Sequence, residues 1–166
     1  MHIVLVHPEI PQNTGNIART CAALGADLHL IRPLGFSVDE RSVRRAGLDY
    51  WSFLSVHEYC SYEQFITSCE PHDLVLFTSR ADRAYTDHEY STDVYLVFGS
   101  ETSGLPEELL HAHRGPVARI PTLAHIRCLN LSNSVAIAAY EVARQHGFPG
   151  LETTRATDSG SRSSKG

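Results

Sequence analysis

Three segments of this 166-residue chain combine glycine, asparagine, glutamate and arginine in patterns that could do chemistry. They are residues 8–19 (PEIPQNTGNIAR), residues 99–106 (GSETSGLP) and residues 120–134 (IPTLAHIRCLNLSNS). An arginine such as Arg19 binds phosphate well, or it stabilises an oxyanion that develops during a reaction. Gly99 lacks a Cβ, so a ligand can approach the backbone there. These patterns indicate a phosphate-bearing substrate and a ligand held against loop backbone.

The position of the glycine-rich turns argues against an ordinary dinucleotide-binding domain. Such a domain places G-x-G-x-x-G directly after its first strand. Here the apolar run at residues 3–6 is followed by HPEIPQNTGNIAR, which holds a single glycine. The glycine-rich turns come late, after residue 98. The sequence therefore predicts that a cofactor binds to the C-terminal half of the chain.

Cysteine and histidine spacing predicts neither a disulfide framework nor a metal site. The four cysteines contain no C-x-x-C pair; they are Cys21, Cys60, Cys69 and Cys128. Of the ten histidines, only His111 and His113 lie close together, without the H-x₃-H or HExxH spacing of zinc sites. We therefore expect no metal.

The bulk composition is that of an ordinary globular protein, with 42% apolar and 20% charged residues. No apolar run approaches the roughly 20 residues that span a bilayer, and we see no signal peptide, so we expect a cytoplasmic location. The formal net charge of −5 counts against nucleic acid as a partner. However, Arg32, Arg41, Arg44 and Arg45 form a local basic group that could still face phosphates.

Strand-like and helix-like segments alternate along the chain. Apolar runs predict strands at residues 3–6, 28–31, 73–78, 94–98 and 117–120. Amphipathic segments predict helices at residues 15–24, 39–46, 62–69, 106–111 and 131–146. The alternation predicts an α/β domain at residues 1–151, with a mostly parallel sheet and helices on both faces. The polar residues 152–166 predict a disordered tail.

The three segments, in this order, resemble the sequence motifs of the SPOUT methyltransferases. Within that class they are similar to the tRNA (cytidine/uridine-2′-O-)-methyltransferase family of the TrmL type. A fourth segment, RRAGLDY at residues 44–50, is also typical of that subfamily. The resemblance extends from residue 1 to about residue 150 and implies a C-terminal trefoil knot, which general folding rules would not predict. It also implies S-adenosylmethionine as methyl donor, tRNA as partner and an obligate homodimer.

The resemblance assigns the cofactor to the ends of the late strands and to the loop before the last helix. The implied cofactor-binding residues are Phe77, Thr78, Gly99, Ile120, Cys128, Leu129 and Asn130. Phe77 could equally be a core residue, Gly99 a plain turn glycine and Asn130 the cap of the last helix. Cys128 stands where many relatives have serine, and we do not assign it as a nucleophile.

The implied catalytic residues are Arg19, Asn16 and Glu101. Arg19 matches an arginine proposed to help deprotonate the ribose 2′-hydroxyl, but a guanidinium is effectively always protonated. We therefore expect Arg19 to orient the hydroxyl and to stabilise the developing oxyanion, with phosphate binding as the alternative. Asn16 could bond the substrate ribose. Glu101 could orient the catalytic loop, or it could serve as a helix cap.

Arg41, Arg44, Arg45 and Tyr140 are the candidates for RNA binding. The arginines could instead belong to a solvated helix surface, and Tyr140 could be a packing residue. The resemblance implies 2′-O-methylation of the wobble cytidine or uridine of tRNA, position 34, in leucine tRNAs. The alternatives are a SPOUT enzyme acting on another tRNA or rRNA site, and a non-catalytic RNA-binding knot protein. A small-molecule enzyme would need the glycine-rich first loop that is missing.

Overall fold

The computed structural model describes residues 1–36, 54–126 and 128–154 of the chain. Its centre is a six-stranded sheet in the order β3-β2-β1-β5-β4-β6, whose neighbouring strands all pair in parallel. The strands are β1 (His2–Val6), β2 (Asp27–Ile31), β3 (Val56–Tyr59), β4 (Leu74–Phe77), β5 (Tyr95–Phe98) and β6 (Val117–Ala118). The predicted parallel α/β sheet is confirmed.

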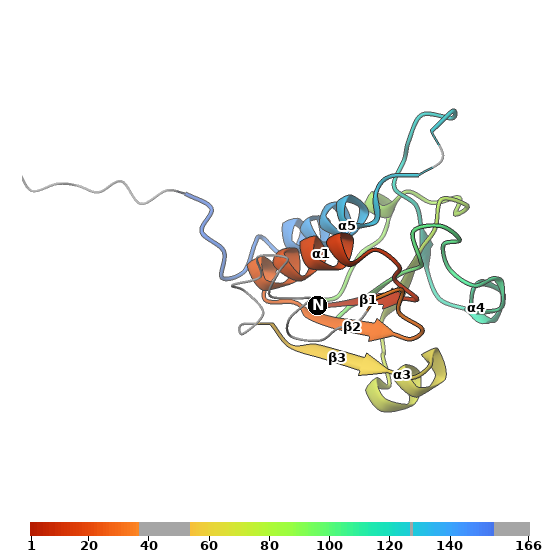
Figure 1. Ribbon diagram of the computed structural model, residues 1–166. Helices are drawn as coiled ribbons and strands as arrows, with labels where there is room; N and C mark the ends of the chain where they lie inside the picture. Colours follow the sequence, from red (N-terminus) through yellow and green to blue (C-terminus); the bar gives the residue numbers. More distant parts are fainter. Residues whose placement is uncertain (37–53, 127, 155–166) are drawn as a thin grey trace, which may run out of the picture.

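Helices cover both faces of this sheet, as predicted (Figure 1). They are α1 (Pro11–Leu24), α3 (Tyr62–Cys69), α4 (Glu107–Ala112) and α5 (Leu131–Gln145). α1 and α5 lie side by side on the face that carries Ile3. α3 and α4 lie on the face that carries Val4. Consecutive strand residues point to opposite faces, so each strand supplies both cores.

Most of the predicted elements are confirmed within one or two residues, but the first helix is longer than predicted. α1 begins at Pro11 rather than at residue 15, because the fixed φ of proline suits the first turn of a helix. Gly25, at φ +63°, ends α1 as predicted. None of the helices in the described residues is long and apolar enough to cross a lipid bilayer.

Two elements were missed, and two predictions cannot be compared. β3 was missed because it is a short edge strand whose central residues are exposed and polar, and the short 3₁₀ helix η2 (Tyr85–Asp87) was missed too. The helix predicted at residues 39–46 lies outside the described residues, as does most of the predicted tail. The domain boundary at residue 151 therefore stays a prediction.

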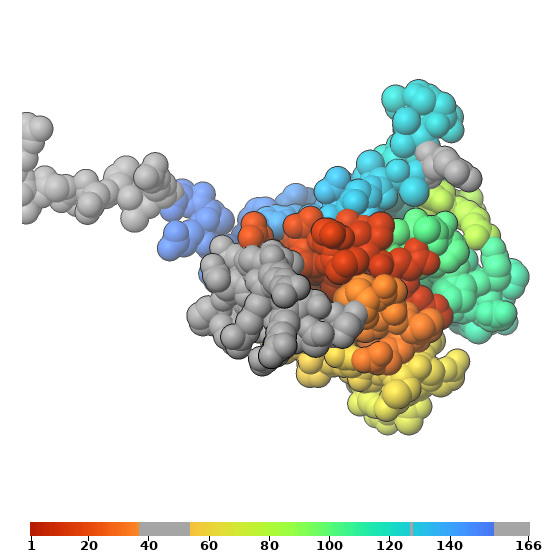
Figure 2. Space-filling model, viewed as in Figure 1, coloured from red at the N-terminus to blue at the C-terminus, as the bar shows by residue number. Residues whose placement is uncertain are grey.

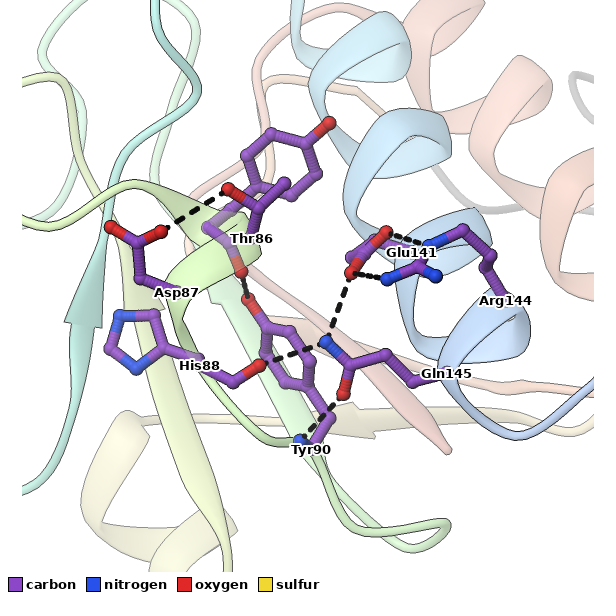
Figure 3. Close-up of polar contacts among 8 residues, drawn as sticks. Thr86, Asp87, His88, Tyr90, Glu141, Arg144 and Gln145 are labelled. Atoms are coloured by element: carbon purple, nitrogen blue, oxygen red, sulfur yellow. Dashed lines mark hydrogen bonds and ion pairs between the residues drawn. The ribbon is translucent and has the colours of Figure 1, made fainter.

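The C-terminal end of α5 is fastened to the segment that precedes β5 (Figure 3). The Gln145 side chain donates to the carbonyl oxygen of His88 at 2.8 Å and accepts from the backbone N–H of Tyr90 at 3.1 Å. The carboxylate of Glu141 accepts from Arg144 at 2.7 and 2.8 Å. The two Gln145 contacts hold the last helix against residues 88–90, whereas the Glu141–Arg144 pair lies within α5. The trefoil knot itself stays a prediction.

Candidate functional site

The three segments that could do chemistry, at residues 8–19, 99–106 and 120–134, meet at one end of the sheet. Residues 7–10 follow β1, and residues 99–105 follow β5, the strand paired with β1. The loop that ends at Asn130 leads into α5, which packs on α1. We call this end of the sheet, at which the parallel strands finish, the carboxyl edge. The opposite end, at which the strands begin, is the amino edge. Open α/β sheets bind ligands at the carboxyl ends of their strands.

Glu101 binds the start of α1. Its carboxylate accepts hydrogen bonds from the backbone N–H groups of Glu9 at 2.9 Å and Ile10 at 3.2 Å, and from the Asn13 side chain at 2.9 Å. Ile10 is the N-cap residue of α1 and provides no side-chain cap of its own. A carboxylate is favoured there because unpaired N–H groups give a helix start partial positive charge. Glu101 therefore caps a helix, as the alternative interpretation held, but it caps α1 and not the following α4.

Asn13 extends this contact to the third segment. Its side-chain oxygen accepts from the Asn130 amide at 2.9 Å, and Asn13 is only 5% exposed. Asn130 in turn caps α5, because its side-chain oxygen accepts from the Ser132 N–H at 2.9 Å and hydroxyl at 2.7 Å. A continuous chain of hydrogen bonds, Glu101–Asn13–Asn130–Ser132, thus joins all three segments. We refer to it as the motif network.

Asn13 and Glu9 were not assigned a catalytic or binding role from the sequence. Asn13 lies in the first turn of α1 and bonds to both other segments. Glu9 accepts from the Thr102 hydroxyl at 2.8 Å and so makes a second tie between the first two segments. No local spacing marks either residue, because their partners lie far along the chain.

Gly99 is required by the chain's own backbone. A Cβ at this position would lie 2.0 Å from the carbonyl carbon of Gly104 and 2.1 Å from the nitrogen of Leu105. The turn between them is closed by two backbone hydrogen bonds between Ser100 and Gly104, at 3.0 and 3.1 Å. The turn role considered for Gly99 is therefore confirmed, and the close packing fixes the path of the 99–105 loop.

Three more of the residues predicted to bind cofactor, Phe77, Thr78 and Ile120, lie at or just after the ends of β4 and β6. The Phe77 ring is buried and stacks on Phe98 with centroids 4.7 Å apart, which confirms its core role. Thr78 donates its backbone N–H to Ala118 at 3.0 Å, so the ends of β4 and β6 lie together. Ile120 is half-buried and packs on the same core. Backbone groups and apolar side chains predominate here, a donor set that fits a purine ring better than a metal ion.

The loop before α5 projects from the body of the domain (Figure 2). Leu123 is 68% exposed and Ile126 43% exposed, although both side chains are apolar. Cys128 is exposed as well, and Leu129 is half-buried. Exposed apolar side chains on a loop are typical of a surface that receives a ligand or a second chain.

Arg19 and Asn16 share the exposed surface of α1, one helical turn apart. Arg19 lies well along the helix from Glu101. The rise of an α-helix is about 1.5 Å per residue, so Arg19 is about 9 Å further along α1 than Asn13 and about 13 Å further than Ile10, both of which Glu101 contacts. The predicted catalytic residues therefore form two groups, one at the carboxyl edge and one on the outer side of α1.

Of the predicted RNA-binding residues, one can be placed. Tyr140 is 47% exposed on α5, so it is not a buried packing residue. Arg41, Arg44 and Arg45 lie outside the described residues.

A cavity of about 990 Å³ lies between α3 and α4, on the other face of the sheet from α1 and α5. It is lined by apolar residues such as Ile66 and Leu109 and by histidines such as His72 and His113. Burial lowers the pKa of His113. None of the predicted catalytic or cofactor-binding residues lines this cavity, so its size does not identify it as the active site.

Comparison with known proteins decides the family. The model of the SpoU rRNA Methylase family matches residues 1–140, which include the whole motif network. The chain belongs to this family. A SpoU-family relative from Yersinia pestis, named a tRNA (cytidine(34)-2′-O)-methyltransferase, is 44% identical over 156 residues, or 90% of this chain and 96% of that protein. One from Geobacillus stearothermophilus, provisionally given the same name, is 49% identical over 154 residues, or 91% and 98%.

Solved structures agree with the family assignment and with its fold. One, from work on 2-OH methylation of C/U34 on tRNA, is 44% identical, covers 88% of this chain and 95% of that chain, and superposes with a TM-score of 0.82. The SpoU methyltransferase AviRb from Streptomyces viridochromogenes, in complex with AdoMet, is 25% identical and has a TM-score of 0.78, covering 88% and 60%. The predicted SPOUT-class α/β architecture is thereby confirmed.

Proposed function

We propose that this chain transfers a methyl group from S-adenosylmethionine to the ribose 2′-oxygen of cytidine or uridine 34, the wobble nucleotide of tRNA. The observation that carries the proposal is the motif network, in which Glu101, Asn13 and Asn130 join the three family segments at the carboxyl edge. Relatives with this activity in their names cover nine-tenths of the chain. The segment at residues 44–50 favours leucine tRNAs as substrates, and we place the reaction in the cytoplasm.

The cofactor is assigned to the loops that the motif network holds together. Thr78, Gly99 and Ile120 would form one wall, mostly through backbone atoms, and Cys128, Leu129 and Asn130 the other, with Phe77 supporting the first wall from the core. S-adenosylmethionine, when bound, supplies a methyl group on a sulfonium with a good leaving group. The protein has mainly to position the acceptor ribose and to exclude water.

Arg19 is proposed to act on the acceptor oxygen. Its guanidinium stays protonated, so it would orient the 2′-hydroxyl and stabilise the negative charge that develops on that oxygen. Asn16, one turn earlier on the same exposed surface, would bond the ribose. Glu101 would act by fixing the start of α1 and the 99–105 loop, which makes it a positioning residue.

We further propose that two copies of the chain form the working enzyme. Arg19 lies about 9 Å along α1 from Asn13 and about 13 Å from Ile10, the residues that Glu101 contacts. In a dimer, Arg19 of each subunit would act at the cofactor bound by the other subunit. The exposed apolar loop at residues 123–126 would then pack against the surface of the partner subunit. Tyr140, Arg41, Arg44 and Arg45 would then bind tRNA across both copies.

The activity is tested with purified protein, labelled S-adenosylmethionine and bulk tRNA. We expect label in tRNA and, after digestion, a single 2′-O-methylated cytidine or uridine at position 34. Label at another tRNA position or only in rRNA would support the alternative SPOUT activities. Absence of any transfer, with RNA binding retained, would overturn catalysis.

Mixed dimers test the sharing of the site. Arg19→Ala and Asn130→Ala chains, each inactive alone, are mixed and allowed to exchange subunits. If Arg19 serves the partner's cofactor, about a quarter of wild-type activity returns, because half of the dimers are mixed and one of the two sites in each is intact. If Arg19 serves its own chain, no activity returns.

A further inference from the structure

The amino edge of the sheet holds a polar cluster that the proposed methyl transfer does not use. His2 begins β1, and Asp27 and His29 lie two residues apart on β2, on the same face. The Nδ1 atom of His2 is 3.1 Å from Nε2 of His29 and 3.4 Å from a carboxylate oxygen of Asp27. One ligand atom from each of the three residues lies within 4.8 Å of the other two.

The outer nitrogen of each histidine is already engaged. Nε2 of His2 is 2.9 Å from the Asp93 carboxylate, and Nδ1 of His29 is 3.0 Å from the Tyr59 hydroxyl, which lies 3.1 Å from Cys69 Sγ. Metal-bound histidines commonly pair their second nitrogen with a carboxylate or another polar group in this way. The inner nitrogens of both rings are thus the ones left to face Asp27.

Aromatic packing fixes both rings. His2 stacks on Tyr95 with centroids 4.1 Å apart, and His29 stacks on His57 at 4.9 Å. His29 is only 3% exposed, so these neighbours hold its ring in one orientation. A neutral, immobilised imidazole is the form of histidine that binds metal ions.

We propose that His2 Nδ1, His29 Nε2 and the Asp27 carboxylate form a binding site for a divalent transition metal, with Zn²⁺ as the best fit. Zinc binds histidine nitrogen and carboxylate oxygen at about 2.0–2.2 Å in a tetrahedron, so two ligand atoms should lie about 3.3 Å apart. The measured separations of 3.1 and 3.4 Å lie on either side of that value. Three protein ligands leave one position for water, which can enter past Asp27, whose side chain is 38% exposed.

His29 can change tautomer, with its proton moving from Nε2 to Nδ1, so that Nε2 can bind the ion. Without metal, Nε2–H of His29 donates to His2 Nδ1, because Nε2–H of His2 donates to Asp93. With metal, the His29 proton would lie on Nδ1 and donate to the Tyr59 oxygen, while the Tyr59 hydroxyl would donate to Cys69. The exchange leaves the Tyr59 and Cys69 groups paired and changes no net charge on the protein.

The ion would join the first residue pair of β1 and β2, at the opposite edge of the sheet from the motif network. Its expected effect is therefore on stability: an ion that binds the folded chain alone raises the free energy of unfolding by mass action. The sequence did not reveal this site because His2 and His29 are far apart in the chain and no local zinc spacing links them.

The test uses the full chain without a polyhistidine tag, titrated with Zn²⁺ against a chromophoric chelator. We expect about one equivalent per chain and, with Co²⁺ in place of zinc, the visible absorption bands of a tetrahedral site. Thermal unfolding followed with and without Zn²⁺ should show a higher Tm with the metal.

Asp27→Asn is the decisive variant, because Asp27 is partly exposed and its loss leaves the core intact. It should weaken zinc binding at least about tenfold and abolish the rise in Tm. His57→Asn is the matched control: its ring also contacts His29 but is not a ligand, so affinity should be retained. Failure of the wild type to bind Zn²⁺, or equal affinity in Asp27→Asn, would overturn the proposal.

Discussion

At the carboxyl edge of the sheet, Glu101 accepts from loop backbone and from Asn13, and Asn13 accepts from Asn130, so that three separate segments are joined. At the amino edge, His2, His29 and Tyr59 bond to one another among stacked aromatic rings and next to regular strands. The first set positions loops whose surface remains accessible to a ligand. The second set is largely enclosed.

Substitutions at the two edges should therefore affect different properties of the protein. Polar groups that hold ligand loops determine activity, because small displacements there misplace reacting atoms. Polar groups enclosed near strand starts determine stability, because leaving one unpaired costs its full desolvation. Substitutions at the carboxyl edge should therefore lower activity most, and substitutions at the amino edge should lower stability.

Arg19→Ala should lower kcat by about 10²–10³-fold, the usual cost of removing a group that stabilises a developing oxyanion. Cofactor affinity, measured by calorimetry, should stay within about twofold, because Arg19 lies on the outer surface of α1. Normal turnover in Arg19→Ala would remove this residue from the mechanism.

Glu101→Ala should lower kcat/KM by about 10–100-fold, because two backbone N–H groups and the Asn13 amide lose their acceptor. The matched control is Glu107→Ala, six residues along. The Glu107 carboxylate is exposed and paired with Arg80, and the Arg80 guanidinium lowers the pKa of this carboxyl group. Equal losses in the two variants would show that the motif network has no special role.

Acid should destabilise the amino edge through His29. Its pKa is about 3 in the folded chain, against an ordinary value of 6.5, so the unfolded chain binds more protons below pH 6.5. The stability that the neutral ring contributes is therefore lost as pH falls from 6.5 towards 3. Between pH 7 and pH 5, the wild type should lose about 2 kcal/mol more unfolding free energy than His29→Gln, measured by denaturant titration. Parallel pH profiles would contradict this assignment.

Gln145→Ala should lower the free energy of unfolding by about 1–2 kcal/mol, because the backbone groups of His88 and Tyr90 lose their partner (Figure 3). Arg144→Ala is the comparison. The Arg144 side chain is 61% exposed and its ion pair with Glu141 lies within α5, so its removal should cost less than the removal of Gln145. An equal or larger loss in Arg144→Ala would show that the Gln145 amide does not fasten α5.

The sequence predicted the sheet and most helices because their signals are local. The run Ile-Val-Leu-Val in β1 and the glycine at position 25 each determine a strand or a helix end by themselves. β3 could not be found in this way, since its place at the sheet edge, and not its composition, makes it a strand.

Individual residues of the site could be predicted from the sequence, but the hydrogen bonds that join them could not. Glu101 and Asn130 were identified, yet the role of Asn13 between them depends on the packing of α1 against α5. The separation of Arg19 from Glu101 could not be foreseen either, because it follows from the start of α1 at Pro11. The same limit explains why His2 and Asp27 gave no metal signal.

The most direct test of the central claim compares two tRNA transcripts that differ at one atom. One carries cytidine at position 34, and the other carries 2′-deoxycytidine there. With purified protein and labelled S-adenosylmethionine, the first transcript should be methylated and the second should take up no label. Equal labelling of both transcripts would contradict methylation of the wobble ribose.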